Sequence, residues 1–290
     1  MMIAHSPAMA STSNNSEPKH VDTFGCSLTG KDRDVNGDQF MVAELKRTAQ
    51  VHHASNANLD GSRRFGANQA HVIVVADGVS GQPGAQVASS LVVDEVMESN
   101  LNAIPWTADL EIDSELGIRK ALKQMVARCH ELITDAAEKM PEKSKMASTI
   151  TMAFVRWPTA FIVHAGDSRA YFVGDREIEQ LTTDHTLAQQ MVEAGELDPE
   201  KAETSRLANM LWNAVGGDSK VTPELTTKTL KSGDALLLCS DGLTKYLNAD
   251  SIRQVSESKT SAREACEDLV RMVKGMGAHD DVTVAMARFQ

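Results

Sequence analysis

The sequence has no excess of basic residues. Its 29 Lys and Arg residues are outnumbered by 40 Asp and Glu residues, which gives a formal net charge of −11 at pH 7. Nucleic acids and anionic membranes select surfaces rich in Lys and Arg, so we expect neither of them as a partner. An acidic surface attracts divalent cations, although in most proteins such an excess is simply a solvated surface.

Paired cysteines, long apolar runs and a signal peptide are also absent from the sequence. The chain has no CxxC motif, and its cysteines stand among apolar or helical neighbours: Cys26, Cys129, Cys239 and Cys266. They predict reduced thiols and a cytoplasmic protein. No stretch approaches the roughly 18 to 20 apolar residues of a membrane span. Residues 1–20 are polar, lack the basic and apolar parts of a signal peptide, and predict a disordered leader.

Several common catalytic and nucleotide-binding motifs are missing as well. The chain has no G-x-G-x-x-G after a strand and no GxxxxGK[ST], so a nucleotide-binding loop is not indicated. It has no HExxH spacing among its nine histidines and no GxSxG motif. Zinc-protease and serine-hydrolase chemistry are therefore unsupported.

Apolar spacing along the chain predicts alternating groups of strands and helices. We expect strands at 40–46, 71–78, 148–157, 160–167, 169–175, 234–242 and 281–289. We expect helices at 85–102, 114–139 and 262–276, and a more polar helical stretch at 186–215.

Short connections between neighbouring strands predict antiparallel hairpins. Pro158-Thr159 forms one such connection, and a Gly-Asp-Ser turn forms the next. Hairpin-connected strands and long paired helices favour an α+β fold in layers, with each helix covering one sheet face. Because residues 21–290 contain no linker-like stretch, we expect one domain there.

Two apolar runs end on an acid followed by glycine. Residues 72–76 run into Asp77-Gly78, and residues 235–239 run towards Asp241-Gly242. An unpaired carboxylate near the edge of a core is costly unless a cation or a donor satisfies it. The simpler alternative is that both are surface turns that end core strands.

Two further acids precede strands, namely Asp38 and Asp280. Hard divalent cations such as Mg²⁺ and Mn²⁺ prefer carboxylate, carbonyl and water oxygens. Four carboxylates from separate strands can hold two such ions about 4 Å apart, with one Asp bridging and a shared water activated. Arg33 offers a two-pronged donor for phosphate. On spacing alone it is equally an exposed surface arginine.

Seven motifs in order resemble those of the metal-dependent Ser/Thr protein phosphatases of the type 2C (PPM) family, in its bacterial form. They are RDVNGD, VVADGVSG, ASTITMAFV, HAGDSRAYFV, LTTDHT, LLLCSDGL and HDDVTV. Each motif is moderately specific, and all seven in order across residues 21–290 are highly specific.

The resemblance implies a four-layer α-β-β-α sandwich, with two central antiparallel sheets and a two-metal cleft at their edge. It implies that Asp77 bridges two Mn²⁺ or Mg²⁺ ions and that the Gly78 carbonyl is a ligand. Asp241 and Asp280 complete the shell of one ion, and Asp38 serves the other. Asp77, Asp38 and Arg33 are then the catalytic residues, and Arg33 binds the substrate phosphate.

The implied activity is hydrolysis of phosphoserine and phosphothreonine in proteins by water, without a phosphoenzyme. The partners are phosphorylated proteins, which we expect to include a cognate Ser/Thr kinase or its substrates. The stretch 186–215 corresponds to a flap that borders the cleft. We expect a monomer. The alternative is a PPM-fold regulatory module that binds a signalling partner and is catalytically weakened; such modules usually lose core metal ligands, whereas all four carboxylates are kept here.

The chain departs from the family pattern at several positions. Gly37 replaces the usual Glu or Gln, Val79 replaces the frequent His or Met, and Ser80 replaces Gly. A third metal in relatives uses Asp167 and an acid at the position of Lys245, whose ammonium opposes a cation. We therefore expect Asp167 to be either a weak third-metal ligand or a turn residue. We expect His185 to be structural.

Overall fold

Two stacked antiparallel sheets form the centre of the computed structural model, which describes residues 18–50, 64–79, 84–102, 114–140, 145–202 and 204–290. Within these residues, one five-stranded sheet has the order β10-β6-β5-β3-β2 (Glu224–Thr229, Thr159–Ala165, Ile150–Arg156, Arg64–Asp77, Asp38–Gln50). The second has the order β1-β12-β11-β7-β8 (Val21–Leu28, Val282–Phe289, Ala235–Cys239, Arg169–Gly174, Glu177–Gln180). A small third sheet pairs β4 (Ala147–Ser148) with β9 (Val215–Gly216).

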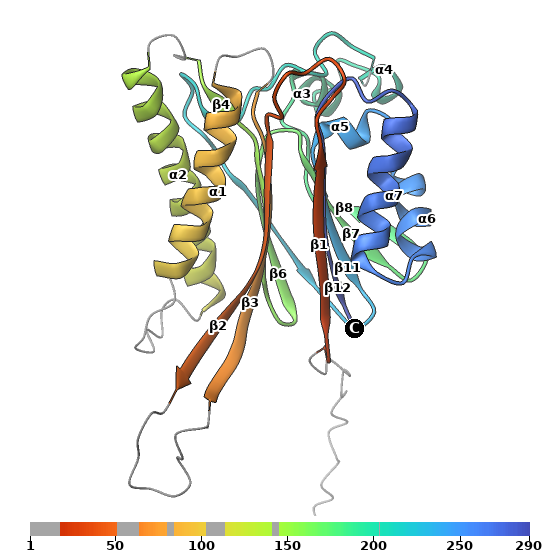
Figure 1. The fold of residues 1–290 in the computed structure, drawn as a ribbon. Helices are drawn as coiled ribbons and strands as arrows, with labels where there is room; N and C mark the ends of the chain where they lie inside the picture. The colour runs from red at the N-terminus through yellow and green to blue at the C-terminus, as the bar shows by residue number, and fades with distance from the viewer. Residues whose placement is uncertain (1–17, 51–63, 80–83, 103–113, 141–144, 203) are drawn as a thin grey trace, which may run out of the picture.

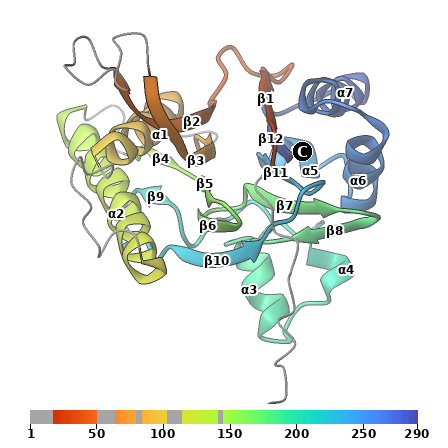
Figure 2. The same ribbon diagram turned by 90° about the horizontal axis from the view of Figure 1, so that it is seen from below.

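Helices cover the outer face of each large sheet. Figure 2 shows α1 (Ala85–Asn102) and α2 (Glu115–Lys139) on one side, and α6 (Ala249–Ser258) and α7 (Ala262–Gly275) on the other. Three short helices lie at the upper end of the sandwich in Figure 1: α3 (Leu187–Glu193), α4 (Pro199–Ala202) and α5 (Asp241–Thr244). The predicted four-layer α+β sandwich is confirmed.

The apolar run that leads to Asp77 is continuous because both faces of β3 are buried. Successive side chains of a strand point to opposite faces. Val72 and Val74 pack in the cluster beneath α1 and α2, whereas Ile73 and Val75 pack between the two sheets. Full burial of each such side chain contributes about 1.5–3 kcal/mol, so the run anchors the strand and fixes where it ends.

The predicted helices were largely correct. Helix α1 has the predicted bounds, and α2 begins one residue late because Ser114 is its N-cap and accepts a hydrogen bond from the Gly117 N–H. Helix α7 ends one residue early, at Gly275. The structure adds α6, which the sequence analysis missed together with β1, β8 and β10.

The predicted hairpin at the Gly-Asp-Ser turn is wrong. Strands β6 and β7 lie in different sheets, so the chain crosses from one sheet to the other at this turn. Gly166 makes the crossing possible with φ of +127°, in the left-handed region that favours glycine. A Cβ at Gly166 would lie 2.5 Å from the Thr149 side chain.

The stretch 186–215 is also less helical than predicted. It contains only α3 and α4 among its described residues, and turns make up most of the remainder up to β9. Gly195, with φ of +72°, follows the end of α3. No described helix is long and apolar enough to cross a membrane. Of the predicted disordered leader, residues 1–17 lie outside the described part, as do residues 51–63 of the polar stretch between β2 and β3.

Candidate active site

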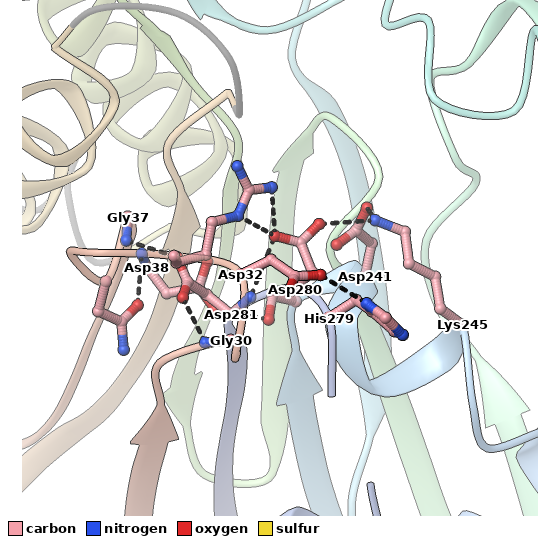
Figure 3. A network of polar contacts seen from close by, with 12 residues as sticks. Gly30, Asp32, Gly37, Asp38, Asp241, Lys245, His279, Asp280 and Asp281 are labelled. Carbon is pink, nitrogen blue, oxygen red and sulfur yellow. Dashed lines mark hydrogen bonds and ion pairs between the residues drawn. The ribbon is translucent and has the colours of Figure 1, made fainter. Parts of the chain in front are cut away.

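The four predicted carboxylates meet at one end of the sandwich. Asp38 begins β2 and Asp77 ends β3, and the two residues are direct partners in the antiparallel ladder. Asp241 begins α5 immediately after β11, and Asp280 lies just before β12. Figure 3 shows Asp38, Asp241 and Asp280 gathered at this end, so both sheets contribute to one cluster.

Asp167 joins the same cluster. Asp77, Asp167 and Asp241 each offer a carboxylate oxygen, and these oxygens all lie within 4.8 Å of one another. Asp167 lies in the β6–β7 connection, which carries the chain from one sheet to the other. Its side chain therefore lies close to acids from other parts of the fold. Of the two expectations for Asp167, its position favours a metal ligand over a simple turn residue.

Two carboxylate oxygens in the cluster are buried without a hydrogen-bond partner among the described residues. They are Oδ1 of Asp38 and Oδ1 of Asp241. The second oxygen of Asp38 accepts a hydrogen bond of 2.7 Å from the Ser240 hydroxyl. Buried carboxylate oxygens without donors are costly, and a set of hard oxygen ligands suits Mg²⁺ or Mn²⁺. The residues present therefore fit divalent cations.

The electrostatics of the cluster agree with this chemistry. Burial raises the pKa of Asp38 to about 7, and nearby Asp241 and Asp281 add to the effect. Burial also raises the pKa of Asp77 well above its usual value, with Asp38 as the next cause. The pKa of Asp167 is raised well above its usual value by burial and by Asp241. These groups repel one another when ionised, and a bound cation relieves that repulsion.

Both Asp-Gly glycines provide space for close backbone contacts. A Cβ at Gly78 would lie 2.3 Å from the Ala85 carbonyl oxygen, and a Cβ at Gly242 would lie 1.9 Å from the Asp281 carbonyl oxygen. Neither glycine has a positive φ. Glycine is therefore required here by close packing beside the acids, which argues against two surface turns.

Arg33 lies beside the cluster in an ion pair with Asp280. Its Nε and Nη2 donate to Asp280 Oδ1 at 3.1 Å and 2.6 Å. The side chain of Arg33 keeps 30% of its exposure, so it is only partly enclosed. This contact uses Nε and Nη2 of the guanidinium.

Asp281 is a residue of this site to which the sequence analysis gave no role. Its Oδ1 accepts from the Gly30 N–H at 2.9 Å, and its Oδ2 accepts from the Gly37 N–H at 2.7 Å. These bonds hold both ends of the loop that carries Arg33 (Figure 3). The signal in the sequence was a second acid beside Asp280, but only the fold reveals its partners.

Lys245 forms ion pairs with two of the predicted metal ligands. Its Nζ lies 2.6 Å from Asp241 Oδ2 and 2.9 Å from Asp280 Oδ2. The two carboxylates raise the pKa of Lys245 despite its partial burial, so the ammonium keeps its charge. The pKa of Asp280 is lowered even though burial opposes the change, because Lys245 and Arg33 surround it. Lys245 therefore competes with cations for these oxygens.

The other departures have clear structural settings where the structure describes them. The Gly37 carbonyl accepts hydrogen bonds from the Gly78 N–H at 3.1 Å and from the Ser89 hydroxyl at 2.6 Å. Val79 donates its N–H to the Ala147 carbonyl at 2.9 Å. Ser80 lies outside the described residues. His185 is buried and accepts from the Gly166 N–H at 3.2 Å, as expected for a structural residue.

Comparison with known proteins identifies the class that this fold and site belong to. A family model described as Protein phosphatase 2C matches residues 51–281, and the chain belongs to this family. The chain is 31% identical to protein phosphatase PhpP of Streptococcus pneumoniae over 219 residues, which cover 74% of this chain and 84% of that protein. The resemblance stated from the sequence motifs is thus confirmed.

Solved structures agree with this assignment. Serine/threonine phosphatase Stp1 from Staphylococcus aureus superposes with a TM-score of 0.77 at 25% identity, covering 99% of this chain and 100% of that chain. The catalytic domain of the serine/threonine phosphatase PstP in complex with two manganese ions has a TM-score of 0.70 at 26% identity. That match covers 92% of this chain and 97% of the PstP chain.

Proposed function

We propose that the carboxylate cluster holds two divalent cations, Mn²⁺ or Mg²⁺, and that Arg33 binds the substrate phosphate beside them. Asp77 would be a ligand of both ions, and the Gly78 carbonyl would be a further ligand. Asp241 and Asp280 serve one ion and Asp38 serves the other, as the family resemblance implies. Two ions held in this way supply an activated water as nucleophile and neutralise charge on the phosphate.

The chain is a serine/threonine protein phosphatase, an enzyme that hydrolyses phosphoproteins. Its family and its relatives PhpP and Stp1 support this function, and the cluster of carboxylates supplies the chemistry for it. The single observation that carries the metal assignment is the pair of buried oxygens without donors, on Asp38 and Asp241. The structure of PstP in complex with two manganese ions supports dependence on divalent metals.

Residues of this chain bind the phosphate and fix the orientation of the charged side chains around it. The guanidinium of Arg33 offers a planar, permanently charged donor for phosphate oxygens. Asp280 fixes that guanidinium, and Asp281 fixes the loop behind it. The Ser240 hydroxyl donates to Asp38 and accepts from the Thr283 N–H at 3.0 Å, so Asp38 is held in one orientation.

The proposal also covers the extent of the domain, the flap, the third ion and the substrates. The phosphatase domain spans residues 21–290, and residues 186–215 form the flap beside the cleft. Lys245 disfavours a third ion, so Asp167 is a weak third ligand at most. The substrates are phosphorylated proteins in the cytoplasm, among them a Ser/Thr kinase or its targets, and the enzyme acts as a monomer.

Hydrolysis of p-nitrophenyl phosphate with Mn²⁺, Mg²⁺ or EDTA tests the proposal. We expect activity with either metal, none with EDTA, and strong loss in Asp77→Asn and Asp241→Asn. Asp250→Asn, at the start of α6, is the matched control and should behave like the wild type. Metal-independent turnover, or full activity in both cluster variants, contradicts the two-metal assignment. A folded wild type without activity in either metal supports the regulatory-module alternative.

A further inference from the structure

A cavity that contains none of the clustered carboxylates is lined in part by residues 186–215. Its volume is about 290 Å³, and it is lined by the segment after β8, by helix α3, by Trp212 and by β10. Helix α3 stands at the same end of the sandwich as α5, which begins at Asp241 (Figure 1). One of the elements that line the cavity therefore lies at the end of the sandwich where the proposed chemistry takes place.

The described residues that line this cavity include three acids and no Lys or Arg: Asp184, Glu193 and Glu224. Asp184 is already neutralised by Arg169, whose Nη2 and Nε lie 2.6 Å and 2.8 Å from its two oxygens. The other two acids have neutral partners. Glu193 accepts from the Gln189 amide at 3.2 Å, and a Glu224 oxygen lies 3.4 Å from His185 Nε2.

His185 does not supply the missing positive charge. Its Nδ1 accepts the Gly166 N–H, which leaves the single proton of a neutral ring on Nε2, facing Glu224. Burial lowers the pKa of His185 even though Glu224 opposes the shift, which favours the neutral ring. Two carboxylates thus face the cavity without a cation among its described lining residues.

Trp212 adds an aromatic wall to this acidic cavity. Its side chain is 41% exposed, and its ring packs on His185 with a centroid distance of 4.8 Å. His185 in turn packs on His164 at a centroid distance of 4.7 Å, and the backbone N–H of Trp212 donates to the His185 backbone carbonyl at 3.0 Å. The indole therefore contacts the buried His185 ring while part of Trp212 stays exposed and lines the cavity. Indole is the best aromatic partner for an alkylammonium or guanidinium cation.

We propose that this cavity binds a Lys or Arg side chain of the phosphoprotein substrate while the phosphate is bound at Arg33. The inference rests on the proposed function, because it names a feature of the substrate of that same site. The Arg169–Asp184 ion pair connects the two places, since Arg169 follows the Asp167 turn and Asp184 borders the cavity.

Matched phosphopeptides test this inference. Each peptide carries one phosphoserine and a single Arg scanned along positions on either side of it, and each has a twin with Gln in place of Arg. We expect one spacing at which the Arg peptide has a kcat/KM roughly three- to thirtyfold higher than its twin, the range of a cation–π contact with an ion pair. Trp212→Ala and Glu224→Gln should each reduce this ratio towards one. Glu200→Gln, in α4 of the flap but outside the cavity, is the matched control and should retain the ratio.

A binding measurement keeps the inference distinct from the phosphatase assignment. The same peptides, carrying a fluorescent label, are titrated with the protein in buffer that contains EDTA. Fluorescence anisotropy then gives their dissociation constants without hydrolysis. Tighter binding of the Arg peptide that is lost in Trp212→Ala and Glu224→Gln supports the cavity even if no peptide is hydrolysed. Equal kcat/KM and equal dissociation constants for the Arg and Gln twins at every spacing overturn the inference about the cavity. Normal hydrolysis of p-nitrophenyl phosphate in the same preparation leaves the phosphatase assignment standing.

Discussion

Asp38 and Asp77 lie directly opposite each other at the end of the β2–β3 ladder. Like charges on directly opposed residues destabilise a sheet, and here one of the two acids is buried. The arrangement is understandable when a cation shares the two carboxylates. It also makes the stability of the metal-free protein depend on pH.

We expect the metal-free protein to lose stability as the pH rises through about 7. The pKa of Asp38 is about 7 in the folded protein, against an ordinary value of 3.8. A raised pKa contributes stability below the unfolded value, and this contribution is lost as the pH rises through the folded pKa. Asp38→Asn removes the titrating group, so in EDTA near pH 8 this variant should be more stable than the wild type by a few kcal/mol, roughly.

Urea unfolding in EDTA at a series of pH values measures this difference. Added Mn²⁺ should stabilise the wild type more than Asp38→Asn, because the variant lacks a ligand of one of the two ions and keeps those of the other. Asp250→Asn should follow the wild type throughout. A metal-free wild type whose stability is flat between about pH 5 and 8 is inconsistent with the raised pKa of Asp38.

Removing the Lys245 charge should strengthen metal binding. In Lys245→Met the ammonium no longer competes for Asp241 and Asp280, so we expect Mn²⁺ to bind roughly tenfold more tightly. Lys245→Asp adds a carboxylate beside the cluster and should increase the number of Mn²⁺ ions bound, with Asp167 as a ligand. Calorimetry measures both quantities without substrate. An affinity and a stoichiometry equal to those of the wild type in both variants rule out this competition.

Arg33→Ala should mainly raise the KM for p-nitrophenyl phosphate, by roughly ten- to a hundredfold, because a charged hydrogen bond to the ground-state phosphate is lost. Arg33→Lys keeps the charge but not the planar donor geometry, and should have an intermediate KM. Steady-state kinetics at saturating Mn²⁺ separate KM from kcat. A folded Arg33→Ala enzyme with an unchanged KM removes Arg33 from the phosphate site.

Asp281→Ala should weaken both the fold and the phosphate site, because two backbone N–H groups lose their carboxylate acceptor. Loss of hydrogen bonds to a charged group costs about 1.5–3 kcal/mol each. Asp281→Asn keeps one acceptor and should lie between the wild type and the alanine variant. Thermal unfolding measures the loss of stability, and a raised KM reports that the loop carrying Arg33 has moved. A KM unaffected in a stable Asp281→Ala protein shows that the loop does not need this clamp.

Gly242→Ala should prevent normal folding, since its Cβ would overlap the Asp281 carbonyl oxygen. Gly275→Ala is the control, because nothing lies within 4 Å of its added Cβ and it ends a helix. That variant should be stabilised by about 0.5–1 kcal/mol. Expression and circular dichroism compare the two. A stable, native Gly242→Ala protein refutes the close-packing role of this glycine.

The sequence could predict those parts of the site that depend on strand ends. Asp77 and Asp241 follow buried apolar runs, and Asp38 and Asp280 precede strands, so their convergence follows once the strands share a sandwich. The bounds of α1 follow in the same way from helical spacing of apolar residues. These features are local, and local pattern is what a single sequence displays.

Other features depend on contacts between distant residues. The Gly-Asp-Ser turn looks like a hairpin because only the packing of β6 and β7 against different neighbours reveals the crossover. The β10 strand, ELTTKT, has no buried side chain, so no alternation marks it. Helix α6 had a usable signal that was missed, since Asn248 caps it by accepting from the Ser251 N–H. The donors to Asp281 and the two partners of Lys245 are set by tertiary structure alone.

The seam between the two sheets runs through the site itself, because one sheet carries Asp38 and Asp77 and the other carries Asp241 and Asp280. The distance between the acids of one sheet and those of the other therefore depends on the apolar layer between the sheets, where Ile73, Leu236 and Phe289 pack. The thickness of this layer sets the separation of the carboxylates. A core substitution far from any acid alters the separation of the ligands as soon as it lets one sheet slide over the other.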